Sequence, residues 1–120
     1  MKKFYFLSSC NTCQRILNHL ELNEDFELHD IKKTPIRTEE LEHLKTMAGS
    51  YEALFSKRAR LYKELGLKEK SLKDDDYKNY ILEHYTFLKR PILVLNDKIF
   101  VGNSPKVINS AITALLNEKQ

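Results

Sequence analysis

Residues 2–13 read KKFYFLSSCNTC, an apolar run that ends in two serines and leads into two cysteines three positions apart. The aromatic and apolar part of this run is typical of a buried strand. The apolar residues beyond the cysteines have helical spacing: Ile16, Leu17 and Leu20. The sequence therefore predicts a strand, then a helix from about Cys10–Cys13 to Leu22, with both cysteines at the turn between them.

The rest of the chain predicts one more strand, a helical block and a final hairpin with a helix. Residues 26–31 alternate apolar and polar side chains, which is the period of a strand. Two short apolar runs at 91–95 and 99–101, separated by Asn96-Asp97-Lys98, predict a β-hairpin. The order β-α-β, helices, β-β-α is typical of the α/β class. It resembles a thioredoxin-like fold with a four-stranded mixed sheet and a helical insertion at about 35–86.

Capping residues give the expected helix ends. Thr38 is expected to cap a helix that Gly49 ends, and Gly66 to stop one or two shorter helices formed by residues 51–65. Ser71 and Asp74 match a capping box in front of the next helix. Ser104 is the expected cap of the last helix, with Pro105 at its first position.

Length and composition favour one globular domain without a membrane segment. A chain of 120 residues fits a single domain, here with its core at about 1–33 and 87–120. The apolar run at residues 4–7 is too short for a secretion signal or a membrane span, so we expect a cytoplasmic protein. The net charge of +3 is mild. The basic cluster Lys57–Arg60, with Lys63, is expected to be a solvated helix face rather than a nucleic-acid surface.

The Cys10-Asn11-Thr12-Cys13 segment indicates redox chemistry. A disulfide between cysteines this close constrains little of the unfolded chain, so it is a poor structural staple. Amide groups at a helix N-terminus favour a thiolate at Cys10, and Cys13 lies one helical turn further on. Cys10 can then attack a substrate and Cys13 can resolve the mixed species to an internal disulfide. There are two alternatives to a redox role: the motif forms half of a zinc site, or the two cysteines are buried without any chemical role.

These features together resemble the arsenate reductase (ArsC)/Spx family over nearly the whole chain. The resemblance rests on the Cys10–Cys13 motif after the first strand and on Arg90-Pro91-Ile92-Leu93 through Val101-Gly102. It includes Ser56-Lys57-Arg58, similar to the family's Ser/Asn-Thr-Arg stretch, and Tyr62-Lys63-Glu64-Leu65 shortly after it.

The resemblance implies a set of site residues around Cys10. Pro91 would be the cis-proline that faces the reactive cysteine in thioredoxin-like folds. Arg90, and Arg58 as a further candidate, would lie near Cys10 and stabilise a thiolate or bind an oxyanion, since a guanidinium offers bidentate donors. Substrate-binding roles are expected for Asn11, Thr12, Pro91 and Arg58. The ordinary alternative for both arginines is an exposed surface position.

The chain departs from the family's arsenate reductases at three places, which leaves two functions open. Those enzymes carry a histidine four residues before the cysteine, an arginine four after it and an arginine after the fourth strand. Phe6, Gln14 and Gly102-Asn103 occupy these places. One expectation is a thiol–disulfide oxidoreductase acting on a small oxyanion or a protein disulfide. It would bind no cofactor or metal, and thioredoxin or glutathione with glutaredoxin would supply electrons. The other is an Spx-like redox sensor that binds RNA polymerase.

Overall fold

The protein forms two compact units in a computed structural model that describes residues 1–118. One unit combines Met1–Thr34 with the chain from Arg90 onward, and the other is Pro35–Lys89. The boundaries lie within a few residues of the predicted insertion at about 35–86. That the whole chain folds as one domain stays a prediction.

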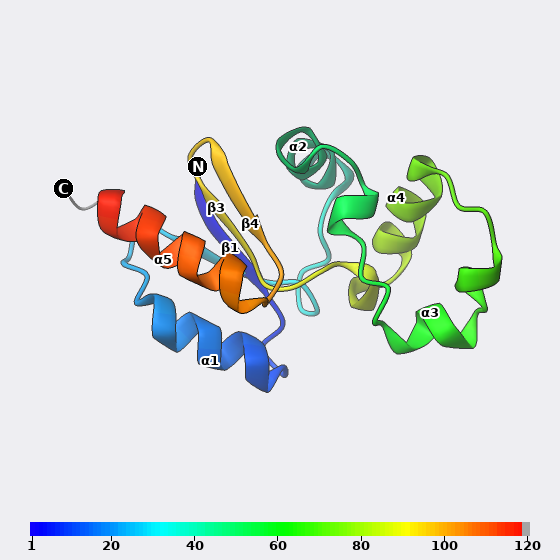
Figure 1. The fold of residues 1–120 in the computed structure, drawn as a ribbon, viewed down its shortest axis with the longest axis horizontal. Coiled ribbons are helices and arrows are strands. Elements are labelled where there is room, and N and C mark those ends of the chain that lie inside the picture. Colours follow the sequence, from blue (N-terminus) through cyan, green and yellow to red (C-terminus); the bar gives the residue numbers. More distant parts are fainter. Residues whose placement is uncertain (119–120) are drawn as a thin grey trace. The chain divides into compact units, whose positions relative to one another are not determined.

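The first unit is built on a four-stranded mixed sheet (Figure 1). Its strands are β1 (Lys2–Phe6), β2 (Glu27–Asp30), β3 (Ile92–Leu95) and β4 (Lys98–Val101), in the spatial order β2-β1-β3-β4. β1 pairs with β2 in parallel, whereas β1 with β3 and β3 with β4 are antiparallel. The predicted fold class is confirmed, including the hairpin. Its turn is Asn96-Asp97, where Asn96 has a φ of 57°, a conformation that asparagine tolerates well.

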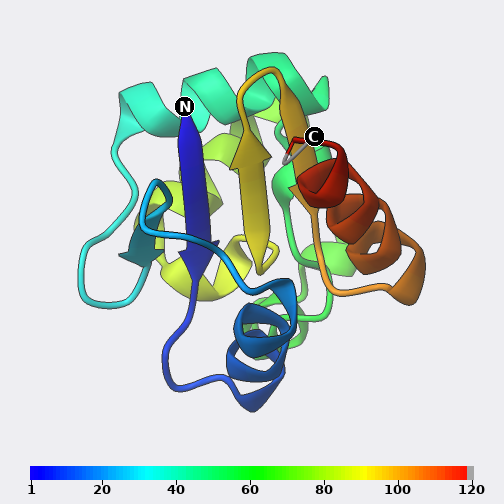
Figure 2. The same ribbon diagram turned by 90° about the vertical axis from the view of Figure 1, so that its left-hand side faces the viewer.

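Two helices, α1 (Asn11–Leu20) and α5 (Pro105–Glu118), lie along one face of this sheet (Figure 2). α1 ends at Leu20, two residues before the predicted end, because Glu21 turns into the left-handed region with a φ of 50°. The predicted cap of α5 is confirmed, since the Val107 amide donates to Ser104 Oγ at 3.2 Å. The apolar faces of these elements form the core of the unit. Its buried members include Phe4, Tyr5, Ile92, Leu93, Val94 and Ala111.

The second unit is helical. It contains α2 (Thr38–Ala48), η1 (Glu52–Leu54), α3 (Arg60–Glu64), η2 (Leu67–Glu69), α4 (Asp74–Glu83) and η3 (Tyr85–Phe87), where η marks a short 3-10 helix. Stacked and edge-on aromatic contacts surround Phe55, whose ring centroid lies 5.2 Å from that of Phe87 and 4.8 Å from that of Tyr77. Residues 51–65 form two short helices, within the predicted range, and Gly66 follows them in the left-handed conformation.

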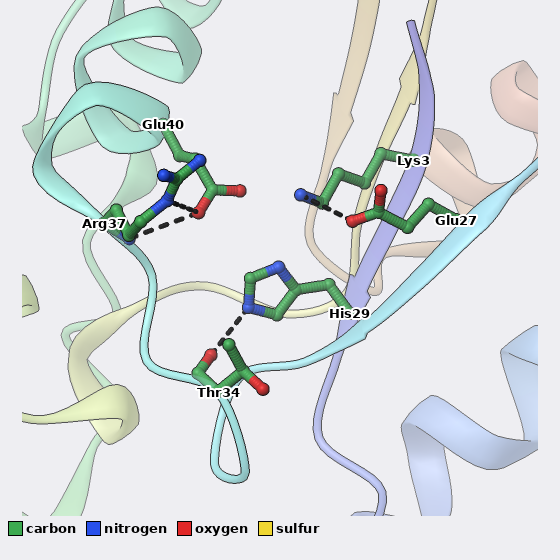
Figure 3. Close-up of polar contacts among 6 residues, drawn as sticks. All are labelled: Lys3, Glu27, His29, Thr34, Arg37 and Glu40. Atoms are coloured by element: carbon green, nitrogen blue, oxygen red, sulfur yellow. Dashed lines mark hydrogen bonds and ion pairs between the residues drawn. The ribbon is translucent and has the colours of Figure 1, made fainter.

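Two predicted helix caps are wrong, one by one residue and the other by two. Arg37 caps α2 instead of Thr38, and its amide donates to Glu40 Oε1 at 3.3 Å (Figure 3). Ser71 does not cap α4, which begins at Asp74 and has the amide of Lys73 bonded to Asp76 at 2.8 Å. Sequence patterns fix the start of a helix only to within about a turn.

The segment after β2 is held by hydrogen bonds within the first unit. His29 is buried in β2, and its Nε2 atom donates to the Thr34 carbonyl at 2.6 Å (Figure 3). The Thr34 amide in turn donates to the Asp30 carbonyl at 3.0 Å. Two positions before His29 in β2, Glu27 pairs with Lys3 of β1 at 2.8 Å. Within the described residues, no helix is both long and apolar enough to cross a membrane.

Candidate active site

Cys10 lies where the chain leaves a tight turn and enters α1. Its amide donates to the Leu7 carbonyl at 3.0 Å, which closes the turn, and its own carbonyl accepts from the Gln14 amide at 3.1 Å. Its backbone is extended (φ −94°, ψ 116°), so Cys10 occupies the capping position in front of the first helical residue, Asn11. The sulfur is thereby placed at the end of a helix whose first amides are not used inside the helix.

The two cysteines differ in exposure. Cys10 is half-buried, whereas Cys13 is 1% exposed and lies on the buried face of α1. Both are free thiols, and they hydrogen-bond to each other. The predicted arrangement of two sulfurs one helical turn apart at the start of a helix is therefore present.

The pKa of the Cys10 thiol is lowered. Burial alone acts to raise it, but the backbone and thiol of Cys13, the backbone of Thr12 and the positive charge of Arg90 together outweigh burial. Helix-terminal amides and a nearby guanidinium both favour the thiolate over the thiol. Cys10 has the environment of a reactive cysteine.

The pKa of the Cys13 thiol is raised to about 11. Burial is the largest cause, and hydrogen bonding to Cys10 and the charge of Cys10 add to it. The backbone of Leu7 and the charge of Arg90 act in the other direction but are too weak to reverse the shift. At neutral pH Cys13 is therefore a protonated thiol that donates to its neighbour.

Arg90 and Pro91 lie directly in front of β3. The Arg90–Pro91 peptide bond is cis, as the resemblance led us to expect, and Pro91 is buried. The Pro91 carbonyl accepts from the Gly102 amide at 2.9 Å, which ties the segment to the end of β4. The half-buried Arg90 side chain acts electrostatically on both thiols.

Comparison with known sequences places the chain in a family. The sequence profile of the ArsC family matches residues 5–111, which include every residue of the site described above. The chain belongs to the ArsC family.

The relatives of this chain in the ArsC family are named either as regulators or as arsenate reductases. The regulatory protein MgsR of Bacillus subtilis is 29% identical over 105 residues, covering 85% of this chain and 82% of MgsR. An arsenate reductase of Acidiphilium multivorum is 32% identical over 92 residues, and the match spans 75% of this chain but only 65% of that enzyme. The global transcriptional regulator Spx of Streptococcus pneumoniae is 25% identical over 81% of this chain and 75% of Spx.

Solved structures of ArsC proteins show the same fold. The arsenate reductase from Vibrio cholerae superposes with a TM-score of 0.72 at 29% identity. The superposition covers 92% of this chain and 96% of that one. The fold is therefore shared over nearly the full length of both proteins.

The remaining predicted ArsC site residues differ in how they relate to Cys10. Thr12 acts on Cys10 through its backbone, and Asn11 is exposed at the first position of α1. Arg58 is an exposed residue of the second unit, and its role near Cys10 stays a prediction. Phe6, where arsenate reductases of the family carry histidine, is buried in β1 with its ring centroid 5.8 Å from that of Phe4.

Three residues that the sequence pattern did not single out hold the cysteine turn. Ser8 Oγ donates to Asp30 Oδ2 at the end of β2, and the Ser8 carbonyl accepts from Gln14 Nε2 at 3.0 Å. Gln14, at the position of the family's arginine, therefore braces the turn through its side-chain amide. The topology alone indicates that Ser8 and Asp30 are close. The first two strands of a β-α-β unit are parallel, so their carboxyl ends, which carry these two residues, lie side by side.

Within residues 1–118, no three histidine, cysteine or acidic side chains gather in a group that could hold a metal ion.

Proposed function

We propose that this chain is a thiol–disulfide oxidoreductase of the ArsC family, with Cys10 as the nucleophile and Cys13 as the resolving thiol. The observation that carries the proposal is the opposite shift of the two pKa values, lowered for Cys10 and raised to about 11 for Cys13. An attacking thiol needs to be ionised near neutral pH, whereas a resolving thiol has to stay protonated until the first step is complete.

The reaction would proceed in two exchange steps. The Cys10 thiolate attacks one sulfur of a substrate disulfide, the substrate S–S bond breaks, and the leaving thiolate takes a proton from solvent. Cys13 then loses its proton and attacks the Cys10 sulfur of the mixed disulfide, which releases the second substrate thiol. The substrate gains two electrons and two protons, while Cys10 and Cys13 become an internal disulfide. Thioredoxin, or glutathione with glutaredoxin, would reduce that disulfide.

We assign supporting roles to the residues around the pair. Arg90 would be the electrostatic helper, since its charge favours the Cys10 thiolate and lies within range of both sulfurs. Asn11, Thr12 and Pro91 would line the approach to Cys10, and Arg58 would contribute an anion-binding guanidinium. The substrate would be a protein disulfide or a small oxyanion such as arsenate, and the protein would act in the cytoplasm.

A second candidate function is a redox-sensing regulator. The similarity to the regulatory protein MgsR, which extends over 82% of that protein, favours it. In this case the Cys10–Cys13 pair would be the switch and RNA polymerase the partner, as the resemblance to Spx implies. Direct nucleic-acid binding is not part of either proposal.

Trapping with a cysteine variant tests the enzymatic proposal. The Cys13→Ser variant, mixed with oxidised glutathione as a model disulfide, should accumulate a stable glutathione adduct on Cys10, measured by intact mass. The parent should form the same adduct only transiently and end as the internal disulfide, and Cys10→Ser should form neither. If Cys13→Ser completes the cycle as the parent does, Cys13 is not the resolving thiol.

Two further assays separate the candidates. Arsenate-dependent oxidation of the two thiols, coupled to thioredoxin or to glutathione with glutaredoxin, would identify the enzyme and its reductant. Capture of RNA polymerase by only one redox form, in stoichiometric amounts and without turnover, would favour the regulator.

A further inference from the structure

We propose that Asp30, acting through Ser8, is a positioning residue that holds the turn in front of α1 so that the Cys10 sulfur stays at the helix amides. The inference deepens the proposed function, because it rests on Cys10 being the reactive thiol. It assigns a role to the carboxyl end of β2, which supplies no atom to the reaction itself.

Ser8 is held from two sides. Its hydroxyl donates to Asp30 in β2, while its carbonyl accepts from Gln14 Nε2 in α1 at 3.0 Å. In the part of the chain that the structure describes, it is the one residue between β1 and Cys10 whose side chain forms a hydrogen bond. The turn is therefore tied to β2 by the Ser8 hydroxyl and to α1 by the Ser8 carbonyl, in addition to the bond from the Cys10 amide to the Leu7 carbonyl.

Asp30 is itself fixed in place. Its backbone lies opposite Phe6 in the parallel ladder, and the next amide, that of Ile31, donates to the Phe6 carbonyl at 2.9 Å. The second carboxylate oxygen of Asp30 accepts from the Lys32 amide at 3.1 Å. The pKa of Asp30 is lowered, because hydrogen bonds from Ser8 and Lys32 and the charge of Lys33 outweigh burial. A carboxylate that stays ionised at neutral pH is a strong and permanent acceptor for the Ser8 hydroxyl.

The turn matters because it sets the reactivity of Cys10. The interactions that favour the Cys10 thiolate come from the backbone of Cys13 and Thr12, the thiol of Cys13 and the charge of Arg90. Each of them depends on where the sulfur sits relative to the first turn of α1. If Ser8 is released, the segment in front of Cys10 gains freedom and these interactions weaken, so the pKa of Cys10 rises toward that of an ordinary thiol.

The test is the thiolate pKa of Cys10, measured by ultraviolet absorbance in the Cys13→Ser background without any substrate. Ser8→Ala should raise this pKa by about half a unit to one unit and, at a pH below the parent's pKa, slow alkylation by iodoacetamide about two- to threefold, since the more basic thiolate is also the better nucleophile. Ser8→Thr should behave as the parent, since it keeps the hydroxyl. Ser9→Ala is the matched control, because Ser9 is the exposed neighbour in the same turn.

Substitutions at Asp30 separate positioning from charge. Asp30→Ala should raise the pKa of Cys10 as Ser8→Ala does. Asp30→Asn should leave it within about 0.2 units of the parent, because the asparagine amide still hydrogen-bonds to the Ser8 hydroxyl. A carboxylate that acts only by its charge gives the opposite pattern, in which Asp30→Asn lowers the Cys10 pKa and Ser8→Ala leaves it unchanged.

The results of these measurements separate a failure of the positioning role from a failure of the proposed function. An ordinary thiol pKa for Cys10 in the parent would overturn the proposed function. A low pKa in the parent that Ser8→Ala and Asp30→Ala leave unchanged would overturn the positioning role alone. Circular dichroism of each variant establishes whether it is folded. Should an alanine variant unfold, Asp30→Asn carries the test, because the positioning role leaves the Cys10 pKa unchanged whereas a purely electrostatic role lowers it.

Discussion

Cys10 and Cys13 hydrogen-bond to each other across the first turn of α1, yet the pKa of one thiol is lowered and that of the other is raised. The difference has a simple origin. Cys10 caps the helix and is half-buried beside amides and the Arg90 guanidinium, whereas Cys13 lies one turn inside and is only 1% exposed. Burial without enough compensating charge leaves Cys13 protonated.

The asymmetry predicts different pH profiles for alkylation of the two thiols. In Cys13→Ser, the rate for Cys10 should rise with pH and level off above its lowered pKa. In Cys10→Ser, burial still holds the pKa of Cys13 above the ordinary thiol value although the contributions of Cys10 are lost, so the rate for Cys13 should be low at pH 8 and keep rising beyond the pH at which the Cys10 rate levels off. Mass spectrometry after timed iodoacetamide exposure gives both profiles. Equal rates for the two variants at pH 8 would refute the assignment of roles.

The raised pKa of Cys13 also predicts a loss of stability at alkaline pH. The folded chain holds this proton up to about pH 11, while the unfolded chain releases it near the ordinary thiol pKa of about 8.5. The stabilisation is therefore fully present below about pH 8.5 and is lost as the pH rises through about 11.

Urea unfolding between pH 7 and 11 should show this loss in Cys10→Ser under reducing conditions. The matched comparison is the double variant Cys10→Ser, Cys13→Ser, in which lysine and tyrosine titrate as before but this thiol is absent. A free energy of unfolding that falls equally with pH in both proteins would contradict the raised pKa.

Much of the fold was predictable because local patterns and topology agree. The cysteine motif between β1 and α1, the hairpin of β3 and β4 and the cap of α5 each depend on residues that are neighbours in sequence. A parallel β-α-β unit then fixes the order of β1 and β2. The cis bond before Pro91 was expected from the family resemblance and not from any pattern of spacing.

The features that the sequence did not predict depend on contacts between residues far apart in the chain. The start of α4 shifted because Asp74 is engaged by amides more than twenty positions earlier. The Ser8–Asp30 contact joins two elements that the sequence separates by a helix. Neither residue stands out by type, since serine and aspartate are common wherever the chain turns.

Arg90 should lower the pKa of Cys10 through its charge. In the Cys13→Ser background, Arg90→Ala should raise the Cys10 pKa by about half a unit, as expected for the loss of one nearby positive charge, while Arg90→Lys should restore most of the shift. The readout is thiolate absorbance against pH. Arg15→Ala is the control, because Arg15 is an exposed arginine of α1 only five residues from Cys10. A larger effect at Arg15 than at Arg90 would show that general surface charge sets the pKa.

Asp74 should stabilise the second unit through the segment that precedes η1. Its carboxylate accepts from the Tyr51 amide at 3.1 Å and the Glu52 amide at 3.0 Å, so Asp74→Ala leaves two amides without their acceptor. We expect the free energy of unfolding to fall by about 1–3 kcal/mol, measured by urea denaturation at pH 7. The neighbouring Asp75→Ala is the matched control. Asp75 is exposed in the same helical turn, so its loss should cost only a few tenths of a kcal/mol from the helix dipole. Equal losses for the two variants would mean that the helix dipole, and not the bonds to Tyr51 and Glu52, accounts for the contribution of Asp74.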